Sequence, residues 1–384
     1  MRRVAIVHPW MPQYRVDFFN QLESKLRAQS IELRVFYGET PPEWNARADS
    51  SNPDRAIKLR TKFINIRGRS LSYKRLRPVR SQSPYDLLIV EQAIRNIETY
   101  QLFMFRRRYA KRIAFWGHGR TYTARKSRAE EFFKQKLTQK ASWFFSYTEG
   151  GISSITRAGY PEERTTVVQN SIDTTSLKID LDAATRFEVE SFIRLHSLTD
   201  KTLIYIGGID SAKRIDFLLT AAQGLHDIDE DYRLLVVGAG DDAGRVADLA
   251  AKEDYLIYLG PLFGKDKAIA MKASRAMMIP GRVGLIAVDS LVSGLPIFTT
   301  DWPYHAPEFE YLTNDRTVIV TDNDVTTYTA TIAKTMGSNN LSRISENCRH
   351  LAKEFSTEYM ADRFCQGIAS ALEEDTDLDC CRHD

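Results

Sequence analysis

Short apolar runs alternate with amphipathic segments along most of the chain. Runs with the length and composition of buried strands cover residues 3–8, 33–38, 86–91, 112–117, 143–148 and 165–170 in the first half, and 202–208, 232–238, 255–260, 276–280, 295–300 and 317–322 in the second. Residues 17–26, 214–225 and 328–337 have the spacing of amphipathic helices. Continuous apolar strands separated by helices are typical of parallel sheets covered on both faces. The pattern therefore predicts an α/β protein with two doubly wound, Rossmann-like domains.

The strand signal stops between residues 173 and 200, where polar and charged residues dominate. We interpret this segment as a linker, which predicts an N-terminal domain over residues 1–172 and a C-terminal domain over 201–354. Residues 355–384 begin with an amphipathic stretch that no strand follows. We expect this last segment to form a helix that crosses back to the first domain.

The overall composition is that of a globular protein, with 43% hydrophobic and 27% charged residues among 384. No apolar run approaches the roughly 20 residues of a membrane-spanning helix, and the first run is too short for a signal peptide. The cysteines, Cys348, Cys365, Cys380 and Cys381, have neither metal-ligand spacing nor a disulfide pattern. The sequence therefore predicts a cytoplasmic protein.

Positive charge is concentrated in the first part of the chain. Residues 1–150 contain 30 Lys and Arg against 13 Asp and Glu, whereas the remainder contains 23 against 37. Basic clusters at 67–80 and 105–112 are interleaved with Tyr73, Phe103, Phe105 and Tyr109. These clusters fit a solvated face, or a contact with an anionic membrane or a pyrophosphate-bearing substrate. No nucleic-acid recognition motif accompanies the charge, which disfavours a nucleic acid as the partner.

Glycine-containing turns follow four of the predicted strands in the second domain. They are "YIGGIDSAKR" with Gly207, Gly208 and Lys213, "VVGAGDD" with Gly238 and Gly240, "YLGPLFG" with Gly260, and "IPGRVGL" with Gly281, Arg282 and Gly284. Ligands of parallel sheets bind beyond the carboxyl ends of the strands, and a helix start there offers N–H groups to a phosphate. Such glycines also serve tight turns alone, but four turns with nearby cations favour a nucleotide diphosphate.

The glycine spacing does not fit an NAD site well. The dinucleotide pattern G-x-G-x-x-G is missing from "GGIDSAKR", and Gly238, Gly240 and Gly244 are one residue too widely spaced. Hydride transfer is therefore disfavoured.

The order of several segments resembles glycosyltransferase family four, the retaining sugar-nucleotide enzymes of GT-B fold. These segments are "VVQNSID", "YIGGIDSAKRIDFLL", "LLVVGAGDD", "YLGPL", "IPGRVGLIAVDSLVSGLPIF", "APEFE" and "FSTEYM". The opening "PQYRVDFFNQL" is similar to that of bacterial polysaccharide members, and "PGRVGL" resembles a branch with the pattern PG-x-VGL. The resemblance covers nearly the whole chain and is strongest over residues 200–310.

The resemblance implies a donor site in the second domain. Lys213 matches the lysine that holds the donor diphosphate, while Gly208 stands at the position of an arginine and Arg214 at that of a glycine. Arg282 or Arg214 would supply the missing charge. The backbone from Gly281 to Leu285, which includes Val283 and Gly284, would lie under a phosphate. Two family glutamates correspond to Gly281 and Asp289, so Asp289 is expected to bind the ribose, and Glu308 is expected to contact the donor.

In the first domain, the resemblance places His118 where it would hydrogen-bond the donor sugar, which makes His118, Lys213 and Asp289 the candidate catalytic residues. His8, Tyr14, Arg15 and Asp17 would face the same cleft, although Asp17 fits a helix cap equally well. Asn170 and Asp173 are expected to shape a hinge. Trp10, Trp44, Trp116 and the basic clusters are either contacts for the acceptor or ordinary core and surface residues.

Together these features predict transfer of a hexose-type sugar from a nucleotide diphosphate to a growing glycan or a polyprenyl-linked acceptor. We expect retention of the anomeric configuration, no metal, a role in surface polysaccharide synthesis, and peripheral contact of the basic domain with the inner face of the membrane. Two alternatives stay open. One is a nucleotide-sugar epimerase of the same fold, and the other is a non-catalytic scaffold that has lost the side chains replaced by Gly208 and Gly281.

Overall fold

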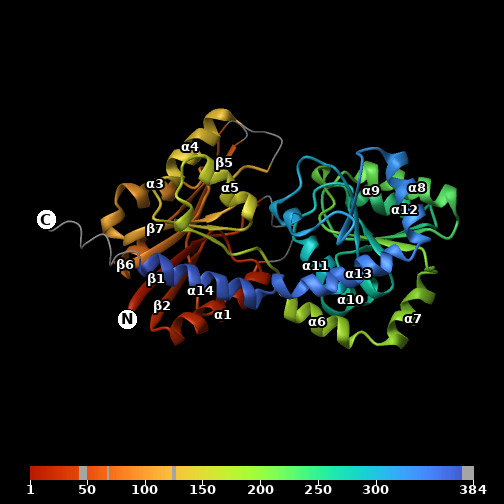
Figure 1. Ribbon diagram of the computed structural model, residues 1–384, viewed down its shortest axis with the longest axis horizontal. Helices are drawn as coiled ribbons and strands as arrows, with labels where there is room; N and C mark the ends of the chain where they lie inside the picture. Colours follow the sequence, from red (N-terminus) through yellow and green to blue (C-terminus); the bar gives the residue numbers. More distant parts are fainter. Residues whose placement is uncertain (43–49, 67–68, 123–126, 374–384) are drawn as a thin grey trace. The chain divides into compact units, whose positions relative to one another are not determined.

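Alternate residues of the first strand, β1 (Arg2–His8), face opposite sides of a parallel sheet. Val4 and Ile6 pack into one apolar cluster, whereas Ala5 and Val7 pack into another on the opposite face. A strand that is apolar on both faces must be covered on both faces, which is what the uninterrupted apolar runs predict. The computed structural model, which describes residues 1–42, 50–66, 69–122 and 127–373, contains two sheets of this kind (Figure 1).

The chain divides into two compact units. Unit 1 comprises Met1–Asn170 and Thr357–Asp384, and unit 2 comprises Ser171–Ser356. Both units have the doubly wound, Rossmann-like architecture that the sequence predicts.

The main sheet of unit 1 has the strand order β3-β2-β1-β6-β7-β8-β9, with all of its pairs parallel. Its other strands are β2 (Ile31–Tyr37), β3 (Ile57–Lys58), β6 (Tyr85–Glu91), β7 (Ala110–Gly117), β8 (Trp143–Ser146) and β9 (Thr165–Val167). The antiparallel hairpin of β4 (Thr61–Ile66) and β5 (Arg69–Lys74), which carries part of the first basic cluster, was not predicted.

Two layers of helices cover this sheet. Helices α1 (Tyr14–Ala28) and α14 (Thr357–Glu373) pack on one face, side by side. The opposite face is covered by α2 (Arg77–Ser81), α3 (Ile97–Met104), α4 (Arg128–Thr138) and α5 (Glu149–Arg157), with the short 3-10 helices η2 (Arg106–Arg108) and η3 (Glu162–Arg164) between them. On α14, the ring of Phe364 stacks on Phe145 with centroids 4.8 Å apart and meets Trp116 edge-on. The last helix of the described chain is therefore part of the core of unit 1.

The sheet of unit 2 has the order β12-β11-β10-β13-β14-β15. Its strands are β10 (Thr202–Ile206), β11 (Arg233–Val237), β12 (Leu256–Gly260), β13 (Ala276–Met278), β14 (Ile297–Thr300) and β15 (Val318–Thr321). Its helices are α6 (Thr174–Ala183), α7 (Arg186–Leu195), α8 (Ile215–Ile228), α9 (Ala243–Ala250), α10 (Gly264–Lys272), α11 (Ile286–Ser293), α12 (Val325–Met336) and α13 (Asn340–Leu351), with the 3-10 helices η4 (Ser211–Lys213), η5 (Pro307–Tyr311) and η6 (Ala352–Phe355). The strand order reverses between β10 and β13, so the loops after these strands flank a topological switch point, where ligands of such sheets bind.

The segment 173–200 is not a linker in the structure. It forms α6 and α7, which belong to unit 2 and pack against α10. Leu177 is buried in the core of this unit, and Glu188 pairs with Lys265 at 2.6 Å. The prediction was wrong because the apolar residues here have helical spacing on one face only, and the many exposed charged residues obscured it.

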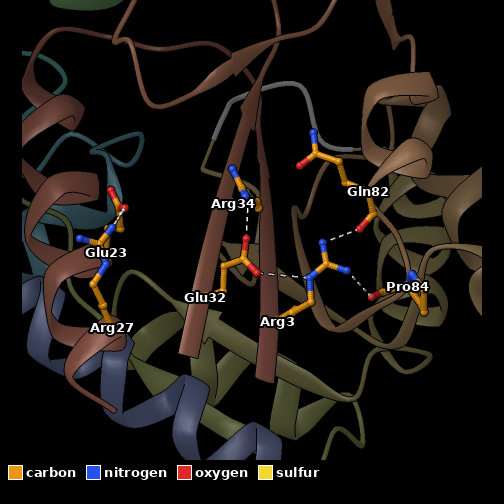
Figure 2. Close-up of polar contacts among 7 residues, drawn as sticks. All are labelled: Arg3, Glu23, Arg27, Glu32, Arg34, Gln82 and Pro84. Carbon is orange, nitrogen blue, oxygen red and sulfur yellow. Dashed lines mark hydrogen bonds and ion pairs between the residues drawn. The ribbon is translucent and has the colours of Figure 1, made fainter. Parts of the chain in front are cut away.

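Ion pairs hold the amino ends of the first strands. Glu32 of β2 pairs with Arg34 at 2.7 Å and with Arg3 of β1 at 3.4 Å (Figure 2). The guanidinium of Arg3 also donates to the carbonyl oxygens of Gln82 and Pro84. These contacts join β1 and β2 to the segment that precedes β6.

Candidate functional site

The loops after β10, β11 and β13 pack backbone against backbone at the carboxyl edge of the sheet in unit 2. Ile209 donates to the carbonyl of Ala239, and Asp242 donates back to the carbonyl of Ile209. A Cβ atom added at Gly238 would lie 1.9 Å from the carbonyl oxygen of Gly207. Glycine is therefore required there by the close approach of two loops, whatever else the position does.

Gly281 has the same kind of packing requirement. A Cβ atom at this position would lie 2.6 Å from the carbonyl oxygen and 3.0 Å from the Cα of Lys213. The backbone of the loop after β13 thus rests on the backbone of η4, with the carbonyl of Ala212 accepting from the N–H of Arg282. The absence of a carboxylate at Gly281 has a physical cause in this chain, because the main chain of Lys213 occupies the space that a side chain would need.

His305 fixes the other side of the "GRVGL" loop. Its Nδ1 accepts from the N–H of Val283 at 3.1 Å, so its Nε2 carries the proton and donates to the carbonyl of Thr300 at 2.9 Å. Burial, with smaller contributions from the positive charges of Arg282, Lys213 and Arg214, lowers the pKa of His305 to about 4. A neutral imidazole therefore connects the end of β14 to the start of α11.

Three cations surround this loop. The ammonium of Lys213 donates to the carbonyl of Arg282 at 2.7 Å, and the guanidinium of Arg282 donates to the carbonyl of Tyr304 at 2.9 Å. Arg214 donates to the carbonyl of Pro280 and to the hydroxyl of Thr300, and its guanidinium lies over the ring of Trp302. All three cations act electrostatically on His305.

Burial lowers the pKa of Arg282 and of Arg214 below the usual arginine value. The carboxylates of Glu308 and Asp210 oppose this shift at Arg282. Because an arginine stays protonated despite such shifts, both guanidinium groups remain positively charged in a partly desolvated setting, where they interact strongly with an anion.

The start of α11 lies within this group of cations. Among the described residues, no acceptor pairs with the main-chain N–H groups of Gly284, Leu285 and Ile286, the last of which is the first residue of the helix. Gly284 and Leu285 are half-exposed, whereas Ile286 is buried. Free amides at the positive end of a helix dipole, next to lysine and arginine, are suited to a phosphate.

The carboxylate predicted to bind the ribose already has a partner. Asp289 lies one turn into α11, is buried, and pairs with Lys267 of α10 at 2.6 Å. Glu308 of η5 is also buried, and its carboxylate lies 4.0 Å from the position of a Cβ added at Gly284.

The structure brings most of the predicted donor residues to one edge of unit 2 but exposes only some of them. Half-exposed residues are Gly207, Gly208, Lys213, Arg214, Gly238, Arg282, Gly284 and Leu285, whereas Gly281, Val283, Asp289 and Glu308 are buried. We therefore expect the half-exposed residues to meet a ligand and Gly281 and Val283 to support the loop. Sequence reasoning missed His305, Thr300, Trp302 and Lys267, because no short motif contains them.

In unit 1, His118 follows β7 and is exposed, with its ring 4.7 Å from that of Tyr147. The next residue, Gly119, donates to the side-chain oxygen of Gln92 at 3.0 Å, which ties the ends of β6 and β7 together. His118 is thus held at the carboxyl edge of its sheet, where an exposed imidazole can hydrogen-bond a sugar hydroxyl.

His8 is buried at the end of β1, where its Nδ1 donates to the carbonyl of Trp10. Burial lowers its pKa to about 3, with a smaller contribution from Arg15. Arg15 is itself buried, hydrogen-bonded to Asn170 and to the sulfur of Met360, with its guanidinium 5.2 Å from the ring of Trp116. His8 and Arg15 therefore belong to the interior of unit 1.

Other candidates in unit 1 also have structural surroundings. Trp10 and Trp116 are buried in the core, and Trp44 lies outside the described residues. Helix α1 begins at Tyr14, so Asp17 lies in its first turn and accepts from Gln21 instead of capping the helix. Asp173 caps α6 by accepting from the N–H of Ser176.

Two further observations concern ligands. No group of three or more metal-binding side chains occurs among the residues that the structure describes.

A hollow of about 550 Å³ lies beside Phe19 and Leu33 of unit 1. Two of the carboxylates on its rim are paired within the protein, Glu23 with Arg27 and Glu32 with Arg34 (Figure 2).

Comparison with known proteins finds a family likeness in unit 2. Residues 200–338, most of unit 2, match the family model described as "Glycosyl transferases group 1". Over 106 residues the chain is 26% identical to a phosphatidyl-myo-inositol mannosyltransferase from Mycobacterium leprae, and the matched part spans 26% of this chain and 28% of that protein.

Solved structures share the fold of the whole chain. Anabaena HepE in complex with UDP superposes with a TM-score of 0.69 and 13% identity, covering 96% of this chain and 100% of that one. The UDP-GlcNAc 2-epimerase of Methanocaldococcus jannaschii superposes with a TM-score of 0.61 and 12% identity, over 96% and 99% of the two chains. These similarities establish the GT-B fold, which consists of two Rossmann-like domains. The family match over residues 200–338 locates the likeness to glycosyltransferases in unit 2.

Glycine at position 281 is predicted to be required for folding. In Gly281→Ala the new methyl would contact the main chain of Lys213, which cannot move without disturbing η4. We expect a loss of about 1–3 kcal/mol in the free energy of unfolding, measured by urea denaturation. The matched control is Gly284→Ala, whose Cβ would lie an ordinary 3.6 Å from that of Ala306 and which should change stability by about 0.5 kcal/mol or less. Equal effects of the two substitutions would contradict the packing described.

The low pKa of His305 predicts that unit 2 loses stability on acidification. Between about pH 6.5 and about pH 4 the unfolded chain binds a proton at His305 that the folded chain does not. Folding stability is therefore fully present above pH 6.5 and decreases as the pH falls, by up to about 3 kcal/mol from this group. His305→Gln keeps an acceptor for Val283 but cannot titrate. We expect a shallower pH dependence of its unfolding free energy, and parallel curves for both proteins would exclude His305 as the cause.

Proposed function

We propose that this protein is a glycosyltransferase that moves a sugar from a nucleotide diphosphate to a glycan or glycolipid acceptor. One observation carries the proposal. The unpaired N–H groups at the start of α11 lie among Lys213, Arg214 and Arg282, at the switch point of a parallel sheet. This combination of amides and cations suits the diphosphate of a sugar nucleotide.

The chemistry follows from where charge develops. When the bond between the sugar and the diphosphate breaks, negative charge grows on the leaving phosphate. Fixed N–H groups at Gly284 and Leu285, with Lys213 beside them, stabilise that charge without reorganising. Departure of the diphosphate and attack by the acceptor hydroxyl on the same face of the sugar gives retention. His118 would hydrogen-bond the sugar. Asp289, once released from Lys267, would hydrogen-bond the ribose.

The rest of the proposal concerns the setting. The transfer uses metal-independent stabilisation of the diphosphate and belongs to surface polysaccharide synthesis on the inner face of the cell membrane. The excess of basic residues in the first 150 positions supports a peripheral contact with that anionic surface. Within the part of the chain that the structure describes, no helix has the length and apolar character needed to cross a bilayer.

The two alternatives predict different chemistry. An epimerase of this fold acts on the nucleotide sugar alone and has no use for a strongly basic acceptor domain. A non-catalytic scaffold was suggested by the missing side chains at Gly208 and Gly281. The contact between Gly281 and Lys213 weakens that reading, because it explains the glycine by packing rather than by loss of function.

Incubation with UDP-, GDP-, dTDP- and ADP-sugars separates the three hypotheses. We expect one donor to be hydrolysed slowly in water and transferred when an acceptor extract is added, with the anomeric configuration followed by NMR. Addition of EDTA should leave the rate unchanged. An isomerised donor would establish the epimerase instead, and the absence of both binding and turnover across the panel would support the scaffold.

Lys213→Ala is predicted to weaken nucleotide binding much more than folding. The side chain is half-exposed, and its hydrogen bond to the carbonyl of Arg282 can be replaced by water. Loss of a charged contact to phosphate should raise the Kd of the preferred nucleoside diphosphate about 10- to 100-fold, measured by calorimetry, with little change in Tm. Lys334→Ala, an exposed lysine of α12, is the control and should bind normally. Unchanged affinity in Lys213→Ala would argue against the site.

A further inference from the structure

One surface of unit 1 exposes apolar side chains that the fold does not use. On α3, Ile97, Tyr100 and Met104 follow helical spacing, so they lie on one face of that helix. Their side chains are 37%, 43% and 74% exposed. Large apolar residues gathered on one exposed face are unusual in a globular domain and indicate contact with another molecule.

Positive charge continues directly from this stripe. Phe105 follows Met104 and is 41% exposed, and the next three residues, Arg106, Arg107 and Arg108, form η2 with all of their side chains exposed. The guanidinium of Arg108 lies 5.0 Å from the ring centre of Phe105. Apolar and cationic groups are thus interleaved at one corner of the unit.

Helix α4 extends the same surface. Phe132 and Phe133 are 55% and 64% exposed, and the ammonium of Lys136 lies 5.7 Å from the ring centre of Phe132. Lys140, which follows the carboxyl end of α4, lines a shallow hollow together with Met104, Phe105 and the three arginines. This hollow brings the end of α3 and η2 next to the carboxyl end of α4.

Helix α3 contributes Glu98, which is buried and pairs with Lys74 at 2.8 Å, and the other carboxylates of α3 and α4 lie at the amino end of α4. Glu131 accepts from the hydroxyl of Thr121 at 2.8 Å, and both Glu130 and Glu131 are half-buried in the first turn, where the helix dipole favours them. The exposed ionised groups from Met104 to Arg108 and from Lys136 to Lys140 are all positive. The surface therefore combines protruding aromatic and aliphatic groups with unshielded cations.

We infer that the surface formed by α3, η2 and the outer side of α4 docks on an anionic lipid bilayer. Phe, Tyr and Met enter the interface between headgroups and acyl chains, while arginine and lysine pair with lipid phosphates. Protruding aliphatic and aromatic groups spread over two helices fit a fluid interface better than they fit a nucleic acid, which would need a groove-shaped or stacking site. The inference deepens the membrane contact in the proposed function by assigning it to named residues.

Binding of the whole chain to vesicles tests the assignment. The probes are vesicles of phosphatidylcholine alone and vesicles in which about a third of the lipid is phosphatidylglycerol, compared by co-sedimentation at physiological salt. We expect binding to the anionic vesicles only. The triple variant R106Q/R107Q/R108Q should lose about 100-fold in partitioning, at roughly fivefold for each cation, and F132S/F133S should lose at least about tenfold.

Matched controls come from exposed residues of unit 2. K178Q/R186Q/R194Q removes three exposed cations of α6 and α7, and F187S/F263S removes two exposed aromatic rings, 73% and 66% exposed. Both controls should bind like the original protein. The assignment would be overturned by equal losses in the controls, by binding that is independent of anionic lipid, or by a triple variant that binds normally. It would also be overturned if the triple variant lost affinity for DNA but not for vesicles.

This assay contains no nucleotide, so its outcome is separate from that of the transfer assay. Failure to bind vesicles with intact donor turnover would remove the docking surface and leave the proposed function in place. Vesicle binding without nucleotide binding would support the docking surface and remove the proposed sugar transfer. Circular dichroism of each variant confirms that it is folded before the comparison is made.

Discussion

The site in unit 2 depends on the contact between two stretches of main chain, the loop at Gly281 and the backbone of Lys213. This contact brings the loops after β10 and β13 together across the point where the strand order reverses. It also brings Lys213 to the carbonyl of Arg282, and with His305 on the other side it fixes where α11 begins. A side chain at position 281 would separate these parts, so the local geometry of the proposed anion site depends on the absence of a Cβ atom at this position.

The same contact changes how the departures from the family pattern are interpreted. Glycine in place of a glutamate suggests a degenerate enzyme when only the sequence is read. In the structure the position is filled by a neighbouring backbone, and the cations around the loop are retained as Lys213, Arg214 and Arg282. Asp289 is likewise kept in place by Lys267 rather than abandoned. We therefore propose that the substitutions build a phosphate site in a different way, on the amides of Gly284 and Leu285, which have no acceptor among the described residues.

Periodicity alone predicted the doubly wound fold and, except for the two-residue β3, the strands of both main sheets, because strands apolar on both faces can only be buried between helices. It did not predict α6 and α7, whose apolar stripe is narrow, or the hairpin of β4 and β5, which lies outside the main sheet. Site residues within one loop, such as Lys213 and Gly284, were found from glycine and charge patterns. Residues that reach the site from another element, such as His305 and Lys267, were not, since their role exists only after β14 and α10 are packed.

Unit 1 is closed by α14, which follows all of unit 2 in the chain. Until the ring of Phe364 covers Phe145 and Trp116, one face of the first sheet lacks part of its apolar cover. During synthesis on the ribosome, residues 171–356 are therefore complete as a folding unit before the N-terminal part is. The usual order, in which the domain synthesised first also folds first, is therefore reversed. Until α14 is synthesised, the N-terminal half exposes a hydrophobic face of its sheet, which chaperones can bind.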